Sequence, residues 1–220
     1  MIYEPINPEK PVSPSNELGV FIDFLSKERC ERITAGADVC PCMPAPVSDP
    51  RAGGKVGVTQ SDTFVADRIE FFTVPSMHQE CIPIVEAIFR NLLKRDYGVE
   101  MEWYEYPHIL RYRKGGNYRH HSDADKWNHE KKCWERVMDR DFSAILYLNS
   151  DFTGGALAFP HLNLRLLPQT GMLVVFPSDH RFVHHAEPTL SGTRYALVTW
   201  GAQRSGQRVM DRLPNKIVRL

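Results

Sequence analysis

The apolar positions of the chain follow two different periods, with the change at about residue 103. Between residues 76 and 96 apolar residues recur at helical spacing, which predicts an amphipathic helix. Ser26 is a suitable N-cap for an earlier helix that runs to about residue 35. After residue 103 short β-rich runs separated by turns predict eight strands, at 105–113, 117–121, 142–149, 155–159, 162–167, 171–176, 181–187 and 194–201.

Eight short strands after a helical region are typical of a double-sheet jelly roll with helices packed on one sheet. The expected fold class is therefore mainly β with α, in a single domain over residues 1–220. The expected parts of this domain are an extended arm (1–18), a helical support region (20–100), a jelly-roll core (103–202) and a basic tail (203–220) that is solvated or lies at an oligomer edge. Residues 38–62 are rich in Pro, Gly, Ser and Asp and are expected to form a loop.

One highly charged segment, residues 124–141, interrupts the run of strands and contains Trp127 and Trp134. Two interpretations stay open. The segment is either a solvated excursion that contains a helix, or a lid in which one of the tryptophans closes over the substrate.

Charge and cysteine content exclude several classes of protein. Lys plus Arg and Asp plus Glu both number 27, so no overall field attracts nucleic acid or a membrane. The sequence shows neither a signal peptide nor a run of about 20 apolar residues, so we expect a soluble, cytoplasmic protein. Its five cysteines are an odd number, and without a secretion signal they are expected to be free thiols. The run Gly53-Gly54-Lys55 lacks the remaining features of a phosphate-binding loop.

The pair His121 and Asp123 carries the most chemical information. A His and a carboxylate two positions apart on an extended chain project from the same side. With a second His they form the 2-His-1-carboxylate triad, which holds iron(II) and leaves coordination positions open. The second His is His184 or His185, which point to opposite faces of a strand. The alternation of neighbouring residues places His184 on the more apolar face and His185 outside, and His120 is likewise expected to point away.

These residues make the chain resemble the iron(II)/2-oxoglutarate-dependent dioxygenases, in particular their prolyl 4-hydroxylase-like branch. That branch reads Tyr-x-x-Gly-x-x-(Tyr/Phe)-x-x-His-x-Asp, and then His-x-x-x-Pro followed by Gly-x-Arg or Gly-x-Lys. The matching residues here are Tyr112, Gly115, Tyr118, His121 and Asp123, and then His184, Pro188, Gly192 and Arg194. The segments 21–33, 147–149 and 154–160 also resemble the family, so the resemblance covers roughly residues 20–202.

The resemblance implies a double-stranded β-helix (a cupin-like jelly roll) and a set of site residues. It implies that His121, Asp123 and His184 bind iron and that Arg194 grips the distal carboxylate of 2-oxoglutarate. Tyr147 and Tyr112 match residues that line the 2-oxoglutarate pocket, although either could be a plain core aromatic. The implied cofactors are Fe(II), 2-oxoglutarate as co-substrate and O2, with ascorbate as a candidate reductant.

The implied reaction hydroxylates an unactivated C–H bond and releases succinate and CO2. The substrate implied by the branch is a prolyl residue of a peptide or protein. The alternative is a free amino acid or a small biosynthetic intermediate. Asp123 argues against a halogenase, and the balanced charge argues against nucleic-acid demethylation. Leu157, Phe159 and Trp200 are expected to wall the pocket, and His161 and Arg165 to lie near its mouth. The sequence does not predict the oligomeric state.

Overall fold

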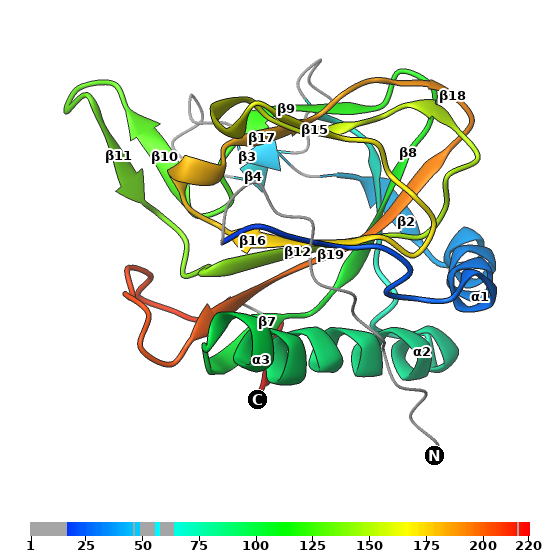
Figure 1. Ribbon diagram of the computed structural model, residues 1–220, viewed down its shortest axis with the longest axis horizontal. Coiled ribbons are helices and arrows are strands. Elements are labelled where there is room, and N and C mark those ends of the chain that lie inside the picture. Colours follow the sequence, from blue (N-terminus) through cyan, green and yellow to red (C-terminus); the bar gives the residue numbers. More distant parts are fainter. Residues whose placement is uncertain (1–16, 46, 49–55, 58–63, 215) are drawn as a thin grey trace.

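The computed structural model describes residues 17–45, 47–48, 56–57, 64–214 and 216–220. Nearly all of the expected N-terminal arm, and the Gly53-Gly54-Lys55 run, lie outside these residues. Two antiparallel sheets stack face to face, and helices cover the outer face of the larger sheet (Figure 1). This is the jelly roll that the strand pattern predicts.

The larger sheet has the strand order β1-β16-β12-β19-β8-β6-β2, and β7 joins it by pairing with β19 and with β20. Its strands are β1 (Gly19–Phe21), β2 (Cys42–Pro44), β6 (Asp67–Ile69), β7 (Met101–Glu105), β8 (His108–Tyr112), β12 (Phe142–Tyr147), β16 (Leu173–Pro177), β19 (Arg194–Gln203) and β20 (Ile217–Arg219).

The smaller sheet has the order β15-β14-β17-β9-β5 and carries the candidate metal ligands. Its strands are β5 (Phe64–Val65), β9 (Asn117–His121), β14 (Leu157–Phe159), β15 (Leu164–Leu166) and β17 (His184–Ala186). Three two-stranded ladders complete the structure: β3 (Val47–Ser48) with β4 (Val56–Gly57), β10 (Asp125–Asn128) with β11 (Cys133–Arg136), and β13 (Thr153–Gly154) with β18 (Thr189–Ser191). A 3-10 turn, η3 (Pro160–Leu162), links β14 to β15 within the smaller sheet, and a second, η4 (His180–Phe182), leads from β16 of the larger sheet to β17 of the smaller one.

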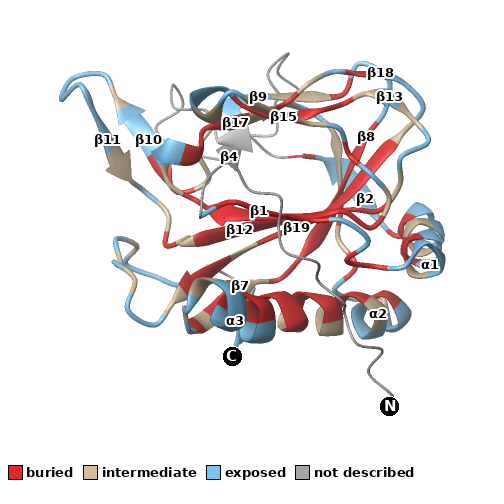
Figure 2. Ribbon diagram, viewed as in Figure 1, coloured by how far each residue is buried: buried red, intermediate tan, exposed pale blue. Residues whose placement is uncertain are grey.

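The strands of the larger sheet are apolar on both faces because each face is covered. On β19, Ala196 and Val198 belong to the core between the two sheets, whereas Leu197 belongs to the core beneath the helices. On β8, Leu110 and Ile109 divide in the same way. Figure 2 shows these central strands buried along their length.

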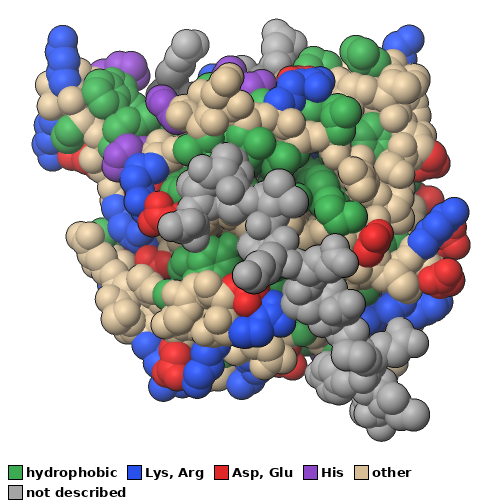
Figure 3. All heavy atoms as spheres, in the orientation of Figure 1, with side chains coloured by type: hydrophobic (Ala, Val, Ile, Leu, Met, Phe, Trp, Pro, Cys, Tyr) green, Lys and Arg blue, Asp and Glu red, His purple; other side chains and the backbone are tan. Residues whose placement is uncertain are grey.

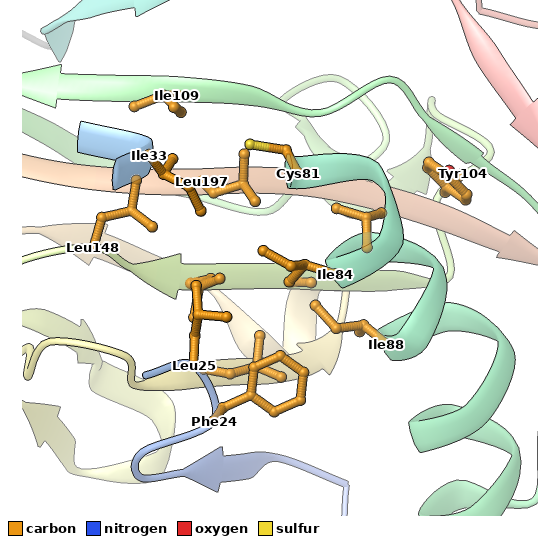
Figure 4. Close-up of a cluster of buried hydrophobic side chains, with 14 of the residues drawn as sticks. Phe24, Leu25, Ile33, Cys81, Ile84, Ile88, Tyr104, Ile109, Leu148 and Leu197 are labelled. Atoms are coloured by element: carbon orange, nitrogen blue, oxygen red, sulfur yellow. The ribbon is translucent and has the colours of Figure 1, made fainter. Parts of the chain in front are cut away.

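The helices lie where the helical periodicity predicts them. Helix α1 (Lys27–Asp38) begins at the Ser26 N-cap and runs three residues beyond the expected end. A continuous helical rod follows later in the chain, made of α2 (Pro75–Glu86), a π-helical turn η2 (Ala87–Leu92) and α3 (Leu93–Tyr97), and it ends at Gly98 with a φ of 68°. Ile84 and Ile88 on this rod point toward the strands of the larger sheet (Figure 4), which gives the rod its single buried face. No helix within the described residues is long and apolar enough to cross a membrane.

Three segments differ in part from what the sequence predicts. Residues 124–141, all of them described, contain no helix, because β10 and β11 form a hairpin in which Trp127 faces Trp134 across the two strands. The described part of residues 38–62 contains β2, β3 and β4 as well as loop. The basic tail is not simply solvated, because β20 pairs with β7 and the neighbouring apolar side chains pack on the helical core.

The region expected to be helical support also supplies sheet strands. Strands β1 and β6 join the larger sheet and β5 joins the smaller one. These strands have only two or three residues each, which is too short for an alternating pattern to be visible in the sequence. All five cysteines carry free thiols within the described part of the chain, as predicted.

Candidate active site

Three potential metal ligands converge on the inner side of the smaller sheet. His121 ends β9, His184 begins β17, and the two residues are direct partners across the antiparallel ladder. Asp123 follows two residues after His121, and its carboxylate oxygens lie 3.5 Å from His121 Nε2 and 3.8 Å from His184 Nε2. One ligand atom from each residue falls within 4.8 Å of the other two. This spacing allows all three residues to bind one ion.

Both histidines present the same nitrogen to this point. The Nδ1 of His121 lies 2.9 Å from the carbonyl oxygen of Arg119, and the Nδ1 of His184 lies 3.0 Å from that of Phe182. A carbonyl can only accept, so each Nδ1 carries the proton and donates it. The Nε2 atoms are therefore left as lone-pair donors, which is the arrangement that metal-binding histidines adopt.

The carboxylate of Asp123 is held by a chain of hydroxyl groups. The Ser143 hydroxyl donates to Asp123 Oδ2 at 2.7 Å and lies 2.8 Å from the Ser178 hydroxyl. Since Ser143 has only one proton to donate, Ser178 must donate to Ser143. Sequence reasoning missed both serines, because nothing in their local sequence connects them to Asp123.

Electrostatics keep the triad in its metal-binding protonation state. Burial would by itself raise the pKa of the Asp123 carboxyl, but the proximity of His184, and then of His121, outweighs it and holds that pKa well below its usual range. Burial, followed by the proximity of His121, lowers the pKa of His184 to about 4. At neutral pH the site therefore offers one carboxylate and a neutral His184 imidazole. Such a mixed nitrogen and oxygen set suits iron(II).

Arg194 lies in the same cavity as the three ligands. It begins β19, is only 2% exposed, and donates from Nη1 to the carbonyl oxygen of Gly155 at 2.6 Å. Its guanidinium carbon lies 3.8 Å from the centre of the Tyr112 ring, and its Nε has no hydrogen-bond partner among the described residues. A buried, incompletely paired guanidinium facing a cavity is suited to binding a carboxylate.

Tyr147 and Tyr112 also line this cavity, and both are buried. Burial raises the pKa of each hydroxyl, so both stay protonated and can donate a hydrogen bond. Gly155 has a φ of 62°, and a Cβ built there would approach Arg194 to 3.3 Å. Glycine at this position therefore permits the turn that brings the Gly155 carbonyl against Arg194.

The remaining wall residues agree in part with the sequence analysis. Leu157 and Trp200 line the cavity, whereas Phe159 packs behind it with its ring 5.6 Å from that of His184. His161 and Arg165 do not line it, and Arg165 instead pairs with Glu187 at 2.6 Å on the surface.

Two further residues lie against the triad and its cavity. Tyr118, which the sequence placed in the family motif without a role in the site, lines the cavity and stacks on His121 with ring centres 3.7 Å apart. Arg140 places its guanidinium carbon 3.9 Å from the centre of the Trp200 ring and donates from Nη1 to the Asp123 carbonyl at 3.3 Å.

The neighbouring histidines lie outside the site, as predicted. His120 and His185 contact each other with ring centres 4.0 Å apart, and neither lines the cavity.

The β10–β11 hairpin projects from the body of the protein, and hydrophobic side chains gather on it in Figure 3. Trp127 on this hairpin is 43% exposed, and Trp134 stacks on the His180 ring, so the hairpin presents an aromatic surface next to Asp123 in the sequence.

Comparisons with known proteins agree with this geometry. The family model for the 2OG-Fe(II) oxygenase superfamily matches residues 107–201. A putative prolyl 4-hydroxylase of Acanthamoeba polyphaga mimivirus is 30% identical over 132 residues, which cover 56% of this chain and 54% of that protein. Prolyl 3-hydroxylase 1 of Gallus gallus is 41% identical over 66 residues, which cover 28% of this chain and 9% of that protein. The chain thus matches about half of the first relative's length and a small part of the second's.

Solved structures share the fold. A viral collagen prolyl hydroxylase from Paramecium Bursaria Chlorella virus-1, in complex with 2-oxoglutarate, has a TM-score of 0.63 and 20% identity over 87% of this chain and 99% of that chain. A Trichoplax adhaerens prolyl hydroxylase bound to a hypoxia inducible factor peptide has a TM-score of 0.66 and 16% identity over 86% of this chain and 84% of that chain. The architecture is the double-stranded β-helix of the 2-oxoglutarate oxygenases. Residues 107–201 of this chain are thus similar to the 2OG-Fe(II) oxygenase superfamily, and the chain is similar to a putative prolyl 4-hydroxylase.

Proposed function

We propose that this protein is an Fe(II)- and 2-oxoglutarate-dependent dioxygenase that hydroxylates proline within a peptide or protein. The observation that carries the proposal is the convergence of His121, Asp123 and His184 within 4.8 Å, in a cavity that also contains the buried Arg194. A metal-binding triad alone would fit many enzymes. The buried cation beside it supplies the anchor that a dicarboxylate co-substrate needs.

Each residue then has a distinct role. His121, Asp123 and His184 hold Fe(II), and Ser143 orients the carboxylate. Arg194 binds the distal carboxylate of 2-oxoglutarate, with Tyr147 and Tyr112 lining the space around it. When iron, 2-oxoglutarate and O2 are bound, they supply an oxidative decarboxylation that yields succinate and CO2 and hydroxylates a C–H bond. The protein positions the reactants and keeps water away from them.

The relatives favour proline as the substrate. The mimivirus relative bears the name of a prolyl 4-hydroxylase, and the Trichoplax adhaerens neighbour holds a peptide fragment. We propose that the proline is hydroxylated as part of a peptide. We also propose that the chain forms one dioxygenase domain, which includes β20. The cytoplasmic location and the use of ascorbate stay predictions from the sequence, and a free amino acid or small intermediate stays the alternative substrate.

The proposal is tested by succinate formation from 2-oxoglutarate with Fe(II) under O2. One substrate panel contains proline peptides and the other contains free amino acids, including proline. His184→Ala and Asp123→Ala should each abolish turnover because they remove a metal ligand. His185→Ala and His120→Ala are matched controls, since these histidines lie next to the ligands but outside the cavity, and both variants should stay active.

The outcomes separate the two substrates. If only peptides stimulate succinate formation, the protein is a peptide hydroxylase. If a free amino acid stimulates it, the substrate is a small molecule instead of a peptide. Full activity in His184→Ala would contradict the metal site itself. Binding of Mn(II) measured by thermal shift gives a second readout of the triad that does not depend on turnover.

A further inference from the structure

A second pocket lies close to the candidate active site, between the β7–β8 turn, the end of β6 and the C-terminal segment. Its volume is about 240 Å³. The residues of its wall that carry polar groups are Arg68, Glu70, Glu105, Tyr106, His108 and Lys216. None of the proposed metal or 2-oxoglutarate residues lines it. We call it the flanking pocket.

One layer of side chains separates the flanking pocket from the active-site cavity. Trp200 lines the active-site cavity, and its ring centre is 5.5 Å from that of His108, which lines the flanking pocket. Arg140 lies over Trp200 on one side and donates to Glu105 at 2.8 Å on the other. A peptide substrate that leaves the active-site cavity past Trp200 therefore reaches the flanking pocket next.

Two polar groups in the wall of the flanking pocket lack a hydrogen-bond partner. The His108 side chain is buried, with 4% of the residue exposed, and its Nδ1 has no partner in the described part of the chain. Arg68 Nε lies 3.2 Å from a Glu70 oxygen, but its N–H is not directed at that oxygen, and it too has no hydrogen-bond partner there. Leaving such groups unpaired in the interior is unfavourable. A ligand that accepts hydrogen bonds would satisfy the arginine and can satisfy the histidine.

The charges around the pocket indicate what kind of acceptor fits. The two acidic residues of the wall are already engaged, because Lys216 contacts Glu70 at 2.9 Å and Arg140 contacts Glu105 at 2.8 Å. Arg68 therefore shares the single Glu70 carboxylate with Lys216, which leaves an excess of positive charge on this side of the pocket. A guanidinium binds a carboxylate more strongly than it binds a neutral acceptor.

We propose that the flanking pocket binds a carboxylate of the peptide substrate, next to the residue that is hydroxylated. The inference rests on the proposed function, since it assigns part of the substrate to this pocket. An extended chain advances about 3.3–3.6 Å per residue, so crossing the layer of rings takes roughly two to four residues. The carboxylate belongs either to an Asp or Glu side chain or to the C-terminus of the peptide.

The test uses acetylated and amidated alanine peptides that contain one proline. A Glu is placed at each position from one to five residues on either side of the proline, and each peptide has a matched Gln version. A third set ends at the same positions with a free carboxylate. Binding of fluorescein-labelled peptides is measured by anisotropy on protein loaded with Mn(II) and 2-oxoglutarate under argon, and succinate formation is measured with Fe(II).

At one spacing, on one side of the proline, the Glu peptide should bind about tenfold more tightly than the Gln peptide. In Arg68→Met this ratio should fall to near one. Arg208→Met is the matched control, because the Arg68 and Arg208 side chains are each 29% exposed and each pairs with a Glu. The control should keep the wild-type ratio. Thermal melting checks that both variants are folded, and His108→Phe provides an independent second variant.

The results distinguish the two sources of the carboxylate. They also separate failure of the carboxylate pocket from failure of the proposed hydroxylase function. Preference for the free C-terminus instead of Glu at the same spacing would support the pocket and identify a chain-terminal carboxylate. Equal binding of the acidic and neutral peptides at every spacing would overturn the carboxylate pocket while peptide-stimulated succinate formation left the hydroxylase intact. If no peptide stimulated succinate formation or bound, both would be overturned.

Discussion

Arg194 is a buried cation with fewer partners than its five N–H donors can use. Only 2% of the residue is exposed, and its identified contacts are the Gly155 carbonyl at 2.6 Å, a hydrogen bond with the Tyr112 side chain, and the ring of the same tyrosine at 3.8 Å. Burial of an ion costs several kcal/mol after relaxation. Each hydrogen bond to the guanidinium contributes about 1.5–3 kcal/mol, and the ring contact contributes about 2 kcal/mol at most. Replacing buried charged groups by apolar side chains of similar volume is nevertheless often stabilising by about 1–4 kcal/mol, because the charge is no longer desolvated.

We therefore expect Arg194→Met to stabilise the protein in the absence of 2-oxoglutarate. Methionine keeps an apolar stem of similar length and removes the buried charge. The free energy of unfolding should rise by about 1–2 kcal/mol. For a chain of this size that corresponds to an increase in Tm of about 2–8 °C.

Addition of 2-oxoglutarate should stabilise the wild type by more than it stabilises the variant. At a ligand concentration of about 100 times Kd, the wild type gains about 2.7 kcal/mol. Loss of the charge-assisted hydrogen bonds to Arg194 should weaken binding by about 10–100-fold, so the variant gains only about 0.4–1.4 kcal/mol at that concentration. The measurement is thermal melting of the Mn(II)-loaded proteins under argon, with and without 2-oxoglutarate.

Arg165→Met serves as the control, because Arg165 forms an ion pair with Glu187 on the surface. Its stability should change by less than about 1 kcal/mol, and its response to 2-oxoglutarate should equal that of the wild type. The reasoning is refuted if Arg194→Met lowers the ligand-free Tm by several degrees, because the arginine is then structural. It is also refuted if the variant keeps the full response to 2-oxoglutarate.

Three further outcomes follow from the same contacts. Ser143→Ala removes the hydroxyl that donates to Asp123 and should weaken metal binding, measured by Mn(II) titration, by about 10–100-fold with little change in Tm. Burial, and then two nearby arginines, hold the pKa of His108 well below 6.5, so below pH 6.5 the imidazole takes up a proton in the unfolded chain but not in the folded one. The stability of the protein should therefore fall as the pH drops below 6.5, and thermal melting of His108→Phe should show a smaller fall. Deletion of residues 216–220 exposes the edge of β7 and apolar side chains packed on the helical core, and should lower the free energy of unfolding by about 2–4 kcal/mol in urea titration.

Much of the fold could be predicted because its signals are local. The long helix after residue 75 repeats its apolar positions at helical spacing. Strands β8, β9 and β12 fall within the predicted strands, and β19 begins where predicted and runs two residues further. The predictions failed for segments whose structure depends on a partner strand. The β10–β11 hairpin is rich in charge, and only the pairing of Trp127 with Trp134 shows that it is β rather than helical. Strand β20 exists because β7 offers it an unpaired edge.

The candidate site divides in the same way. The sequence by itself determined the candidate ligands and the candidate anchor, because His121 and Asp123 are two residues apart and the spacing of His184, Pro188 and Arg194 matches a family motif. The residues of such a motif lie close together in the sequence, so the motif is visible without the fold. It also separated His184 from His185, since neighbours on a strand face opposite sides.

Only the tertiary structure decided what surrounds those ligands. Ser143, Ser178 and Arg140 come from different segments and reach Asp123 through the stacking of the two sheets. The flanking pocket likewise joins β6, the β7–β8 turn and the C-terminal segment, which are far apart in the sequence. Hydrogen bonds and burial act over a few ångströms in space, regardless of separation along the chain. A residue's chemical type can therefore be read from the sequence, whereas its partners depend on how the sheets pack.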